Sequence, residues 1–245
     1  MYDEYFIGDP AAQMPHWMLQ TEVDNCAVAA EVSIINQFFE DNVSLDDATY
    51  ISAANGWYQP GLGTNPGDIG NMFDIYEVPN HTVMGATIEQ LSSELQQGHG
   101  VIVGVNSSEL WDQGVLNEIK QFFNDAFGLD TSDLNPADHA VVVTGIDFSN
   151  PDCPMVIMND SGIAGGAAVD YPLTQFMDAW ENSGFYYTST SVPIPDATHP
   201  SPDALGFDLA GFLGIATTVL TGSPEVGMLV TEIADLEWEL LLESV

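Results

Sequence analysis

The residues that could carry out chemistry begin with Cys26, in the stretch LQTEVDNCAVAAEVSIINQFF, residues 19–39. A thiol attacks a carbonyl carbon as the thiolate, and the unpaired N–H groups at a helix N-terminus favour that negative sulfur. Cysteine is also among the most commonly buried residue types, so position alone fits a small apolar residue as well as a nucleophile. Partners elsewhere in the chain must decide between the two interpretations.

A nucleophilic cysteine needs a base for its proton and a donor for the oxyanion that forms on attack. His139 opens the apolar stretch HAVVVTGI, so a rigid strand end would hold its imidazole. Gln20 lies six residues before Cys26, and its side-chain amide could donate towards a carbonyl oxygen above the sulfur. Each has a plain alternative, because a single histidine is often a satisfied core residue and a single glutamine an ordinary surface residue.

The second nitrogen of such an imidazole is usually oriented by an Asp or Asn. The stretch PMVIMND, residues 154–160, ends in Asn159 and Asp160 and follows 139–146 after a short turn, which predicts an antiparallel neighbour. Successive strand residues point to opposite faces, so only one of the two can face His139. Asp138 is excluded by the same argument. The alternative is that NDSG is simply a turn after a strand.

Cys26 needs a helix to position it, and the apolar spacing predicts one over residues 24–40, with Asp24 or Asn25 as its cap. Two adjoining apolar stripes indicate that protein surrounds this helix. A second helix begins after Ser44, and a short third helix lies within residues 65–78. Together these segments predict a small helical half.

The pattern changes from residue 80 onward to strands and helices in alternation. The run 139–146 is continuously apolar, which predicts a strand buried on both faces. Residues 109–138 are polar and predict a helix followed by a long loop. The remaining predicted elements are strands at 81–86, 100–105, 154–160 and 185–192, and helices at 87–98 and 172–184.

Four prolines within residues 193–203 mark a linker, which divides the chain into a domain at 1–192, the linker, and a tail at 204–245. The tail predicts an acidic, amphipathic helical segment that could pack on the domain, cover its cleft or engage a partner protein. Its apolar stretch 204–222 is interrupted by Asp208 and four glycines and has no flanking Lys or Arg, so no membrane span is expected.

The charge balance is extreme, with 37 acidic residues against one base, Lys120, and a formal net charge of −36. Binding to nucleic acid or to anionic lipid is therefore excluded, since both depend on Lys and Arg. The acids predict a solvated shell that serves solubility, a salty medium or the attraction of cationic substrates.

Other signals are lacking in the sequence. No basic segment precedes an apolar stretch at MYDEYFIGDP, so no secretory signal is visible, and a cytoplasmic location or export by another route is expected. Cys26 and Cys153 are expected to stay reduced. There is no Cys/His cluster with zinc spacing and no glycine-rich phosphate loop, so neither a metal nor a cofactor is expected.

The order of these residues resembles the papain-like cysteine peptidases, closest to the bacteriocin-processing type and its free-standing, peptidase C39-like relatives. The matching segments cover most of residues 15–190 in family order. They are MLQTEVDNCAVAAEVSII, LSSELQQGHGVIVGVNSSELW, DHAVVVTGID, VIMNDSG and YPLTQFMDAW. Two details depart from the family: Ala27 follows the cysteine where glycine is common, and Ser161 replaces the usual proline after Asp160.

The resemblance implies an α+β papain-like fold, in which a helical subdomain faces an antiparallel sheet across a cleft. It assigns Cys26 as nucleophile, His139 as general base and acid, Asp160 as the orienting acid and Gln20 as oxyanion donor, acting on a peptide or protein substrate. No exporter domain follows, so the leader-peptide specificity of the transporter-fused members does not carry over. Two alternatives are a non-catalytic peptide-binding domain and an acyltransferase or amide hydrolase on the same scaffold.

Overall fold

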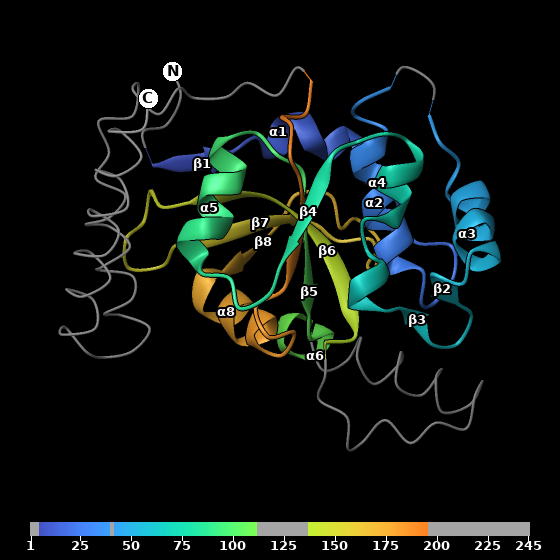
Figure 1. Ribbon diagram of the computed structural model, residues 1–245. Helices are drawn as coiled ribbons and strands as arrows, with labels where there is room; N and C mark the ends of the chain where they lie inside the picture. Colours follow the sequence, from blue (N-terminus) through green and yellow to red (C-terminus); the bar gives the residue numbers. More distant parts are fainter. Residues whose placement is uncertain (1–4, 40–41, 112–136, 196–245) are drawn as a thin grey trace.

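The computed structural model describes residues 5–39, 42–111 and 137–195 (Figure 1). Its centre is an antiparallel sheet with helices on both faces, so the predicted α+β class is confirmed. The strands of this sheet are β1 (Phe6–Gly8), β4 (Asn80–Val83), β5 (Val101–Val105), β6 (His139–Asp147), β7 (Met155–Asn159), β8 (Val169–Pro172) and β9 (Tyr187–Thr190).

The strand order is β4–β9–β5–β6–β7–β8, and β1 pairs with the end of β6. Every pairing is antiparallel. The predicted neighbours β6 and β7 pair with Val142 opposite Asn159. This register brings the residues that follow β7 towards the beginning of β6, where His139 stands.

Two sets of helices cover the sheet (Figure 1). One side carries α2, α3 and α4, and the other carries α5, α6 and α8. Their bounds are α2 Cys26–Ile35, α3 Leu45–Ala54, α4 Asn71–Ile75, α5 Ile88–Gln96, α6 Ser107–Leu110 and α8 Leu173–Glu181. The short helix α1 (Pro10–Gln13), the 3-10 turns Met14–His16 and Pro66–Asp68, and the small hairpin β2 (Tyr58–Gln59)–β3 (Gly63–Thr64) complete the described part.

Strand β6 is the centre of the core because its side chains serve both helical layers. Val141 and Val143 pack with the cluster that includes α5 and α8. Ala140 and Val142 pack with the cluster built around α2. The prediction of a strand buried on both faces is therefore confirmed, and its first residue is held firmly in place.

Helix α2 is shorter than the predicted helix over 24–40, since it begins at Cys26 and ends at Ile35. Asn25 occupies the N-cap position, but its side chain is bonded to Thr21, Glu22 and Thr49 rather than to the first turn. The Asp24 carboxylate accepts hydrogen bonds from Tyr58 and Gly61 instead. The predicted cap residues thus fix the loop before Cys26, and neither side chain covers the first N–H groups of the helix.

The other predicted elements differ mainly at their ends. The strand predicted at 81–86 is β4 at Asn80–Val83, and the helix predicted at 172–184 is α8, with Pro172 as its N-cap residue. Strands β1 and β8 were not predicted, because each is short and lacks a clear alternating pattern. Most of residues 109–138, most of the linker and the whole tail lie outside the described residues.

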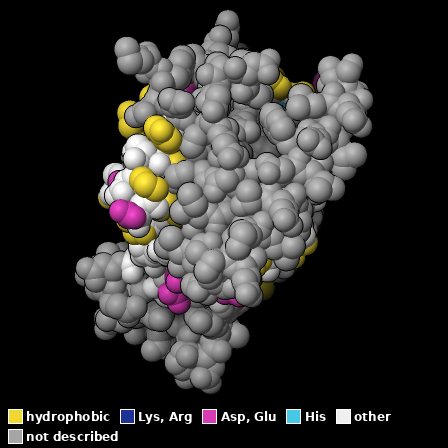
Figure 2. Space-filling model, turned by 90° about the vertical axis from the view of Figure 1, so that its left-hand side faces the viewer, with side chains coloured by type: hydrophobic (Ala, Val, Ile, Leu, Met, Phe, Trp, Pro, Cys, Tyr) yellow, Lys and Arg dark blue, Asp and Glu magenta, His cyan; other side chains and the backbone are white. Residues whose placement is uncertain are grey.

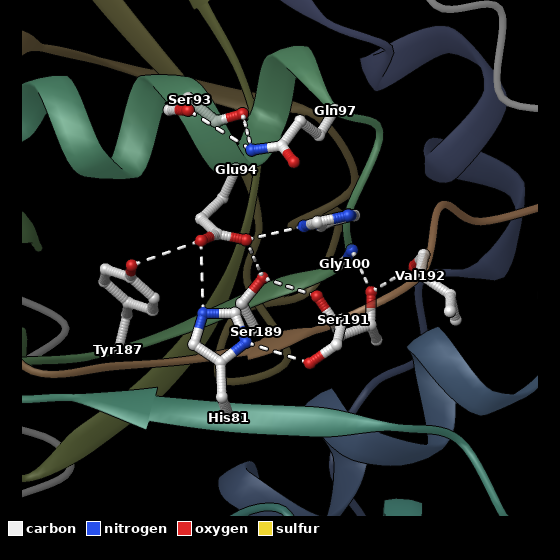
Figure 3. Close-up of polar contacts among 11 residues, drawn as sticks. His81, Ser93, Glu94, Gln97, Gly100, Tyr187, Ser189, Ser191 and Val192 are labelled. Atoms are coloured by element: carbon white, nitrogen blue, oxygen red, sulfur yellow. Dashed lines mark hydrogen bonds and ion pairs between the residues drawn. The ribbon is translucent and has the colours of Figure 1, made fainter. Parts of the chain in front are cut away.

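A buried polar cluster joins α5 to strands β4 and β9 (Figure 3). Glu94 accepts from His99 Nδ1 at 2.6 Å and from His81 Nε2 at 3.1 Å. It also accepts from the hydroxyls of Ser189 at 2.8 Å and Tyr187 at 3.3 Å. We call these five residues the Glu94 cluster. Each of its polar contacts crosses between elements or loops, so the cluster helps fix α5 on the sheet.

The described surface has acidic side chains and no basic ones, because Lys120 falls within residues 112–136. On the face shown in Figure 2, acidic side chains stand near hydrophobic ones. Of the helices in the described ranges, none combines the length and apolar character that crossing a bilayer requires.

Candidate active site

His139 and Asp160 form the centre of the site. His139 Nε2 lies 2.7 Å from Asp160 Oδ1, and the His139 and Asp160 side chains are 4% and 0% exposed. His139 is the first residue of β6, and Asp160 comes directly after β7. Two adjacent antiparallel strands therefore position His139 and Asp160, and the sheet fixes the backbone of both strands.

Cys26 completes the contact on the other side of the imidazole. It lies close enough to His139 to help raise the pKa of the imidazole, and Asp160 holds Nε2, so Nδ1 is the nitrogen that remains for the thiol. Cys26 is the first residue of α2, where the N–H groups lack a side-chain acceptor from the cap. Its sulfur therefore lies at the positive end of a ten-residue helix. Sequence analysis placed these three residues together, and the structure has them in contact.

Asn159 and Asp160 differ in their contacts, since only Asp160 contacts His139. Asn159 donates from Nδ2 to the carbonyl oxygen of Gln13 at 3.0 Å and accepts from the Ala168 amide at 3.0 Å. It faces away from His139, as the alternation of strand residues requires. Asp138 also faces elsewhere, since its carboxylate accepts from the Ser107 amide at 2.7 Å and hydroxyl at 2.9 Å.

Gln20 lies next to the site but its amide is engaged with the loop before Cys26. Nε2 donates to the carbonyl oxygens of Glu22 at 2.9 Å and Val23 at 2.7 Å. Its backbone N–H donates to the Ser161 carbonyl at 2.9 Å, beside Asp160. In this arrangement Gln20 ties the nucleophile loop to the segment after β7, and both hydrogens of its amide are used within the loop.

Sequence analysis missed three residues that hold Asp160. The Trp111 indole donates to Oδ2 at 2.9 Å, and the Gly162 amide donates to Oδ1 at 2.8 Å. The Trp17 indole donates to the Asp160 carbonyl oxygen at 2.6 Å. The Trp111 and His139 ring centroids are 4.9 Å apart at 60°. No local pattern announces these contacts, because Trp111 and Asp160 are 49 residues apart.

The electrostatics of the pair follow from burial and from these contacts. Burial disfavours the charged imidazole, but the charge and hydrogen bond of Asp160, helped by Cys26, outweigh it and hold the pKa of His139 above its ordinary value of 6.5. Burial likewise opposes ionisation of Asp160, and His139, Trp111 and Gly162 outweigh it, so the pKa of this carboxyl lies below its usual range. The arrangement therefore favours an imidazolium beside a carboxylate, with a thiol on its other side.

Within residues 5–39, 42–111 and 137–195, no group of three or more His, Cys, Asp or Glu side chains is arranged to hold a metal ion. Both cysteines are free; Cys26 is half-buried and Cys153 is exposed. The side chains that meet at the site are a thiol, an imidazole and a carboxylate.

A papain-like arrangement is what this fold and site define: a nucleophile helix packed against an antiparallel sheet that carries His and Asp. The sequence profile of the Peptidase C39 like family matches residues 9–188, and the chain belongs to that family. The match covers β4 to β8, the beginning of β9 and both helical layers, and it leaves β1 and the tail outside.

The chain is also similar to individual proteins. Uncharacterised proteins of Mycobacterium tuberculosis and Mycobacterium bovis are 29% identical over 210 residues, covering 75% of this chain and 84% of theirs. The crystal structure of a provisionally named C39-like peptidase from Bacillus anthracis matches with a TM-score of 0.50 at 16% identity. That match covers 76% of this chain and 96% of the other, and it shows a shared fold.

Proposed function

We propose that this protein is a cysteine peptidase, with Cys26 as nucleophile, His139 as general base and acid, and Asp160 as the orienting acid. The observation that carries the proposal is the buried contact of His139 with both Asp160 and Cys26 at the start of α2. Membership of a peptidase family and the match to a C39-like fold support it.

The reaction follows from these positions. The Cys26 thiolate attacks the peptide carbonyl carbon, and the carbonyl π electrons move to oxygen. As this tetrahedral oxyanion collapses, the C–N bond breaks and the imidazolium of His139 gives its proton to the leaving amine. Water then loses a proton to His139 and attacks the thioester, which releases the new carboxylic acid and restores the thiolate with its imidazolium.

The oxyanion needs donors that point at the carbonyl oxygen in the tetrahedral state. The backbone N–H of Cys26 lies at the start of α2, and Gln20 is the side-chain candidate. For this role its Nε2 must leave the carbonyl oxygens of Glu22 or Val23 when substrate binds. Gln20→Ala is expected to lower kcat by about 10²-fold through loss of this donor. Unchanged kcat in a folded variant would remove Gln20 from the mechanism.

Labelling tests the nucleophile directly. Iodoacetamide is expected to label Cys26 rapidly near neutral pH in the wild-type protein. Cys26→Ala should lose this labelling, whereas Cys153→Ala should keep both the labelling of Cys26 and the peptidase activity. Cys153 is the matched control because it is free and more exposed. Labelling confined to Cys153, or hydrolysis of a mixed peptide library that survives in Cys26→Ala, would contradict the proposal.

A further inference from the structure

One side chain outside the catalytic set touches both His139 and Asp160, and no part of the proposed mechanism has used it. Trp111 donates its indole N–H to Asp160 Oδ2, the oxygen that does not face His139, at 2.9 Å. Its ring also packs against the His139 ring, with centroids 4.9 Å apart. Asp160 is fully buried, so this donor is not replaced by solvent if it is lost.

Each oxygen of the Asp160 carboxylate accepts its own hydrogen bonds. Oδ1 receives His139 Nε2 and the Gly162 amide, and Oδ2 receives Trp111. A carboxylate that is held at both oxygens cannot rotate about its Cβ–Cγ bond without breaking a contact. It also stays ionised more readily, because hydrogen bonds to the charged form favour that form. Trp111 therefore affects both the direction and the charge of the group that His139 needs.

Trp111 is positioned by helix α6, which is tied at both of its ends. It follows α6, whose first residue, Ser107, is bound by the Asp138 carboxylate through its amide and its hydroxyl. The end of α6 is tied to α8, since Gln175 Nε2 donates to the carbonyl oxygens of Glu109 at 2.7 Å and Leu110 at 3.3 Å. Asp138 directly precedes β6, so two successive residues, Asp138 and His139, hold the helix that leads to Trp111 and supply the base.

The space beside Trp111 is also reserved. A Cβ at Gly162 would lie 2.7 Å from Trp111 Cζ2 and 2.9 Å from His139 Cε1. Glycine is thus required where the indole, the imidazole and the turn after β7 meet. The Trp111 indole therefore packs tightly against the imidazole and the turn after β7.

We infer that Trp111 is a positioning residue of the catalytic pair: its indole N–H and ring lock Asp160 and His139 so that the imidazolium can stand beside the Cys26 thiolate. This inference rests on the proposed function. It assigns a role to a side chain that would otherwise be counted with the hydrophobic core, against which it also packs.

The test is the pH dependence of Cys26 alkylation in the full chain, measured with iodoacetamide in the Cys153→Ala background. A thiolate–imidazolium pair exists between two pH limits, one where the thiol loses its proton and one where the imidazolium loses its own. Trp111→Phe keeps an aromatic ring but removes the N–H. Because it weakens the support of the imidazolium, this window is expected to narrow by about one pH unit in total, and kcat to fall about tenfold with KM unchanged.

Trp180→Phe is the matched control. The Trp180 indole is also buried and donates to a backbone carbonyl, that of Tyr186 at 2.8 Å, but Trp180 belongs to the core around α8. This variant is expected to lose stability and keep the wild-type window. If Trp111→Phe does not fold, Trp111→Leu serves as a second variant, since it also removes the N–H that Asp160 Oδ2 receives, and the same narrowing is expected.

The outcomes separate the two proposals. A wild-type Cys26 that is alkylated only as an ordinary thiol, without a low-pH plateau, overturns the proposed function and this inference with it. A wild-type window that persists unchanged in folded Trp111→Phe, or that narrows equally in Trp180→Phe, overturns the positioning role alone. Narrowing confined to the Trp111 variants supports it.

Discussion

Two parts of the molecule join histidine rings to a buried carboxylate, and they differ in what stands on the far side of the ring. In the candidate active site, His139 contacts Asp160 through one nitrogen and the Cys26 thiol through its other side. In the Glu94 cluster, His81 contacts Glu94 through Nε2 and the Ser191 hydroxyl through Nδ1, each at 3.1 Å (Figure 3). In both places an imidazole therefore lies between a carboxylate and a thiol or hydroxyl group that could act as a nucleophile.

The Glu94 cluster lacks the features that would make the neighbouring Ser191 hydroxyl reactive. Ser191 donates its backbone N–H to the Pro79 carbonyl at 2.7 Å, so that group cannot stabilise an oxyanion. The His81 side chain is 40% exposed, whereas that of His139 is 4% exposed, so solvent screens the first and not the second. Glu94 is shared among two imidazoles and two hydroxyls. A histidine–carboxylate contact alone thus does not define a catalytic site; the candidate active site adds a thiol at a helix N-terminus.

The largest contrast is expected from the histidines themselves. His139→Asn is expected to lower kcat/KM for peptide hydrolysis by about 10³-fold, because both proton transfers pass through this ring. His99→Asn should leave activity within about twofold and lower the free energy of unfolding by about 1–3 kcal/mol, the cost of an unmet buried hydrogen bond. Steady-state kinetics and urea unfolding on both variants measure the two effects. A comparable loss of activity in His99→Asn would break the distinction.

Substitutions of the two carboxylates, Asp160 and Glu94, should differ less in their effect on activity than those of the histidines. Asp160→Asn keeps an oxygen that can accept from His139 Nε2 but loses the charge that stabilises the imidazolium. We expect kcat to fall roughly 10- to 100-fold for this reason. Glu94→Gln removes a largely buried carboxylate outside the candidate active site and should alter stability only. Equal kcat values for Asp160→Asn and wild type would show that orientation, and not charge, is what Asp160 supplies.

The same comparison shows how far sequence alone could go. Cys26 and His139 were found because each stands at the beginning of a strongly patterned element, and Asp160 was narrowed to one of two residues by the pairing of β6 with β7. The α+β class and the buried strand 139–146 followed from periodicity. These are local signals, and the structure has these elements where the sequence predicts them.

Contacts between distant side chains escaped prediction. Trp111 and Trp17 reach Asp160 across 49 and 143 residues, and nothing in their neighbourhoods indicates a polar partner. Gln20 was assigned an oxyanion role from its spacing to Cys26, yet its amide is bonded to Glu22 and Val23. The end of α2 at Ile35 was also missed, because the apolar spacing continues beyond the last helical residue. The division at residues 193–203 stays a prediction.

The pH dependence of stability should also distinguish the two clusters. Burial opposes ionisation of both carboxyls, but their hydrogen-bond partners outweigh it and lower the pKa of Asp160 and of Glu94. Each carboxyl therefore contributes stability above its unfolded pKa, near 3.8 for Asp160 and 4.5 for Glu94, that is lost as pH falls through the folded value. The raised pKa of His139 contributes stability that is present below pH 6.5 and lost as pH rises through its folded value.

Urea unfolding between pH 3 and pH 10 is the measurement. Glu94→Gln should reduce the acid loss only, whereas Asp160→Asn should reduce both the acid loss and the alkaline loss. Each change is expected to be on the order of 1 kcal/mol, since a tenfold change in proton affinity corresponds to about 1.4 kcal/mol. An alkaline slope that is the same in Asp160→Asn and wild type would argue against a charged His139–Asp160 pair.

Glu31 must be controlled in this experiment, because its ionisation adds a second loss of stability as pH rises. This residue of α2 is buried, and burial, opposed by hydrogen bonds from the Gly70 and Met72 amides, raises its pKa to about 8. Its contribution to stability is thus lost as pH rises through about 8. Glu31→Gln keeps an oxygen for both amides and removes the ionisation. Measuring Asp160→Asn in the Glu31→Gln background therefore isolates the His139 term.

The smallest effect should come from salt, which acts on the surface and spares both buried clusters. With a formal charge of −36, the exposed acids repel one another, and each close like-charge pair costs a few tenths of a kcal/mol. Raising KCl from 0.05 to 1 M shortens the Debye length from more than about 10 Å to about 3 Å. The free energy of unfolding should then rise by a few tenths to about 1 kcal/mol, while the pH window of Cys26 alkylation stays in place. A window that moved with salt as far as stability did would mean that surface charge, and not the buried contacts of Asp160, sets the state of the catalytic pair.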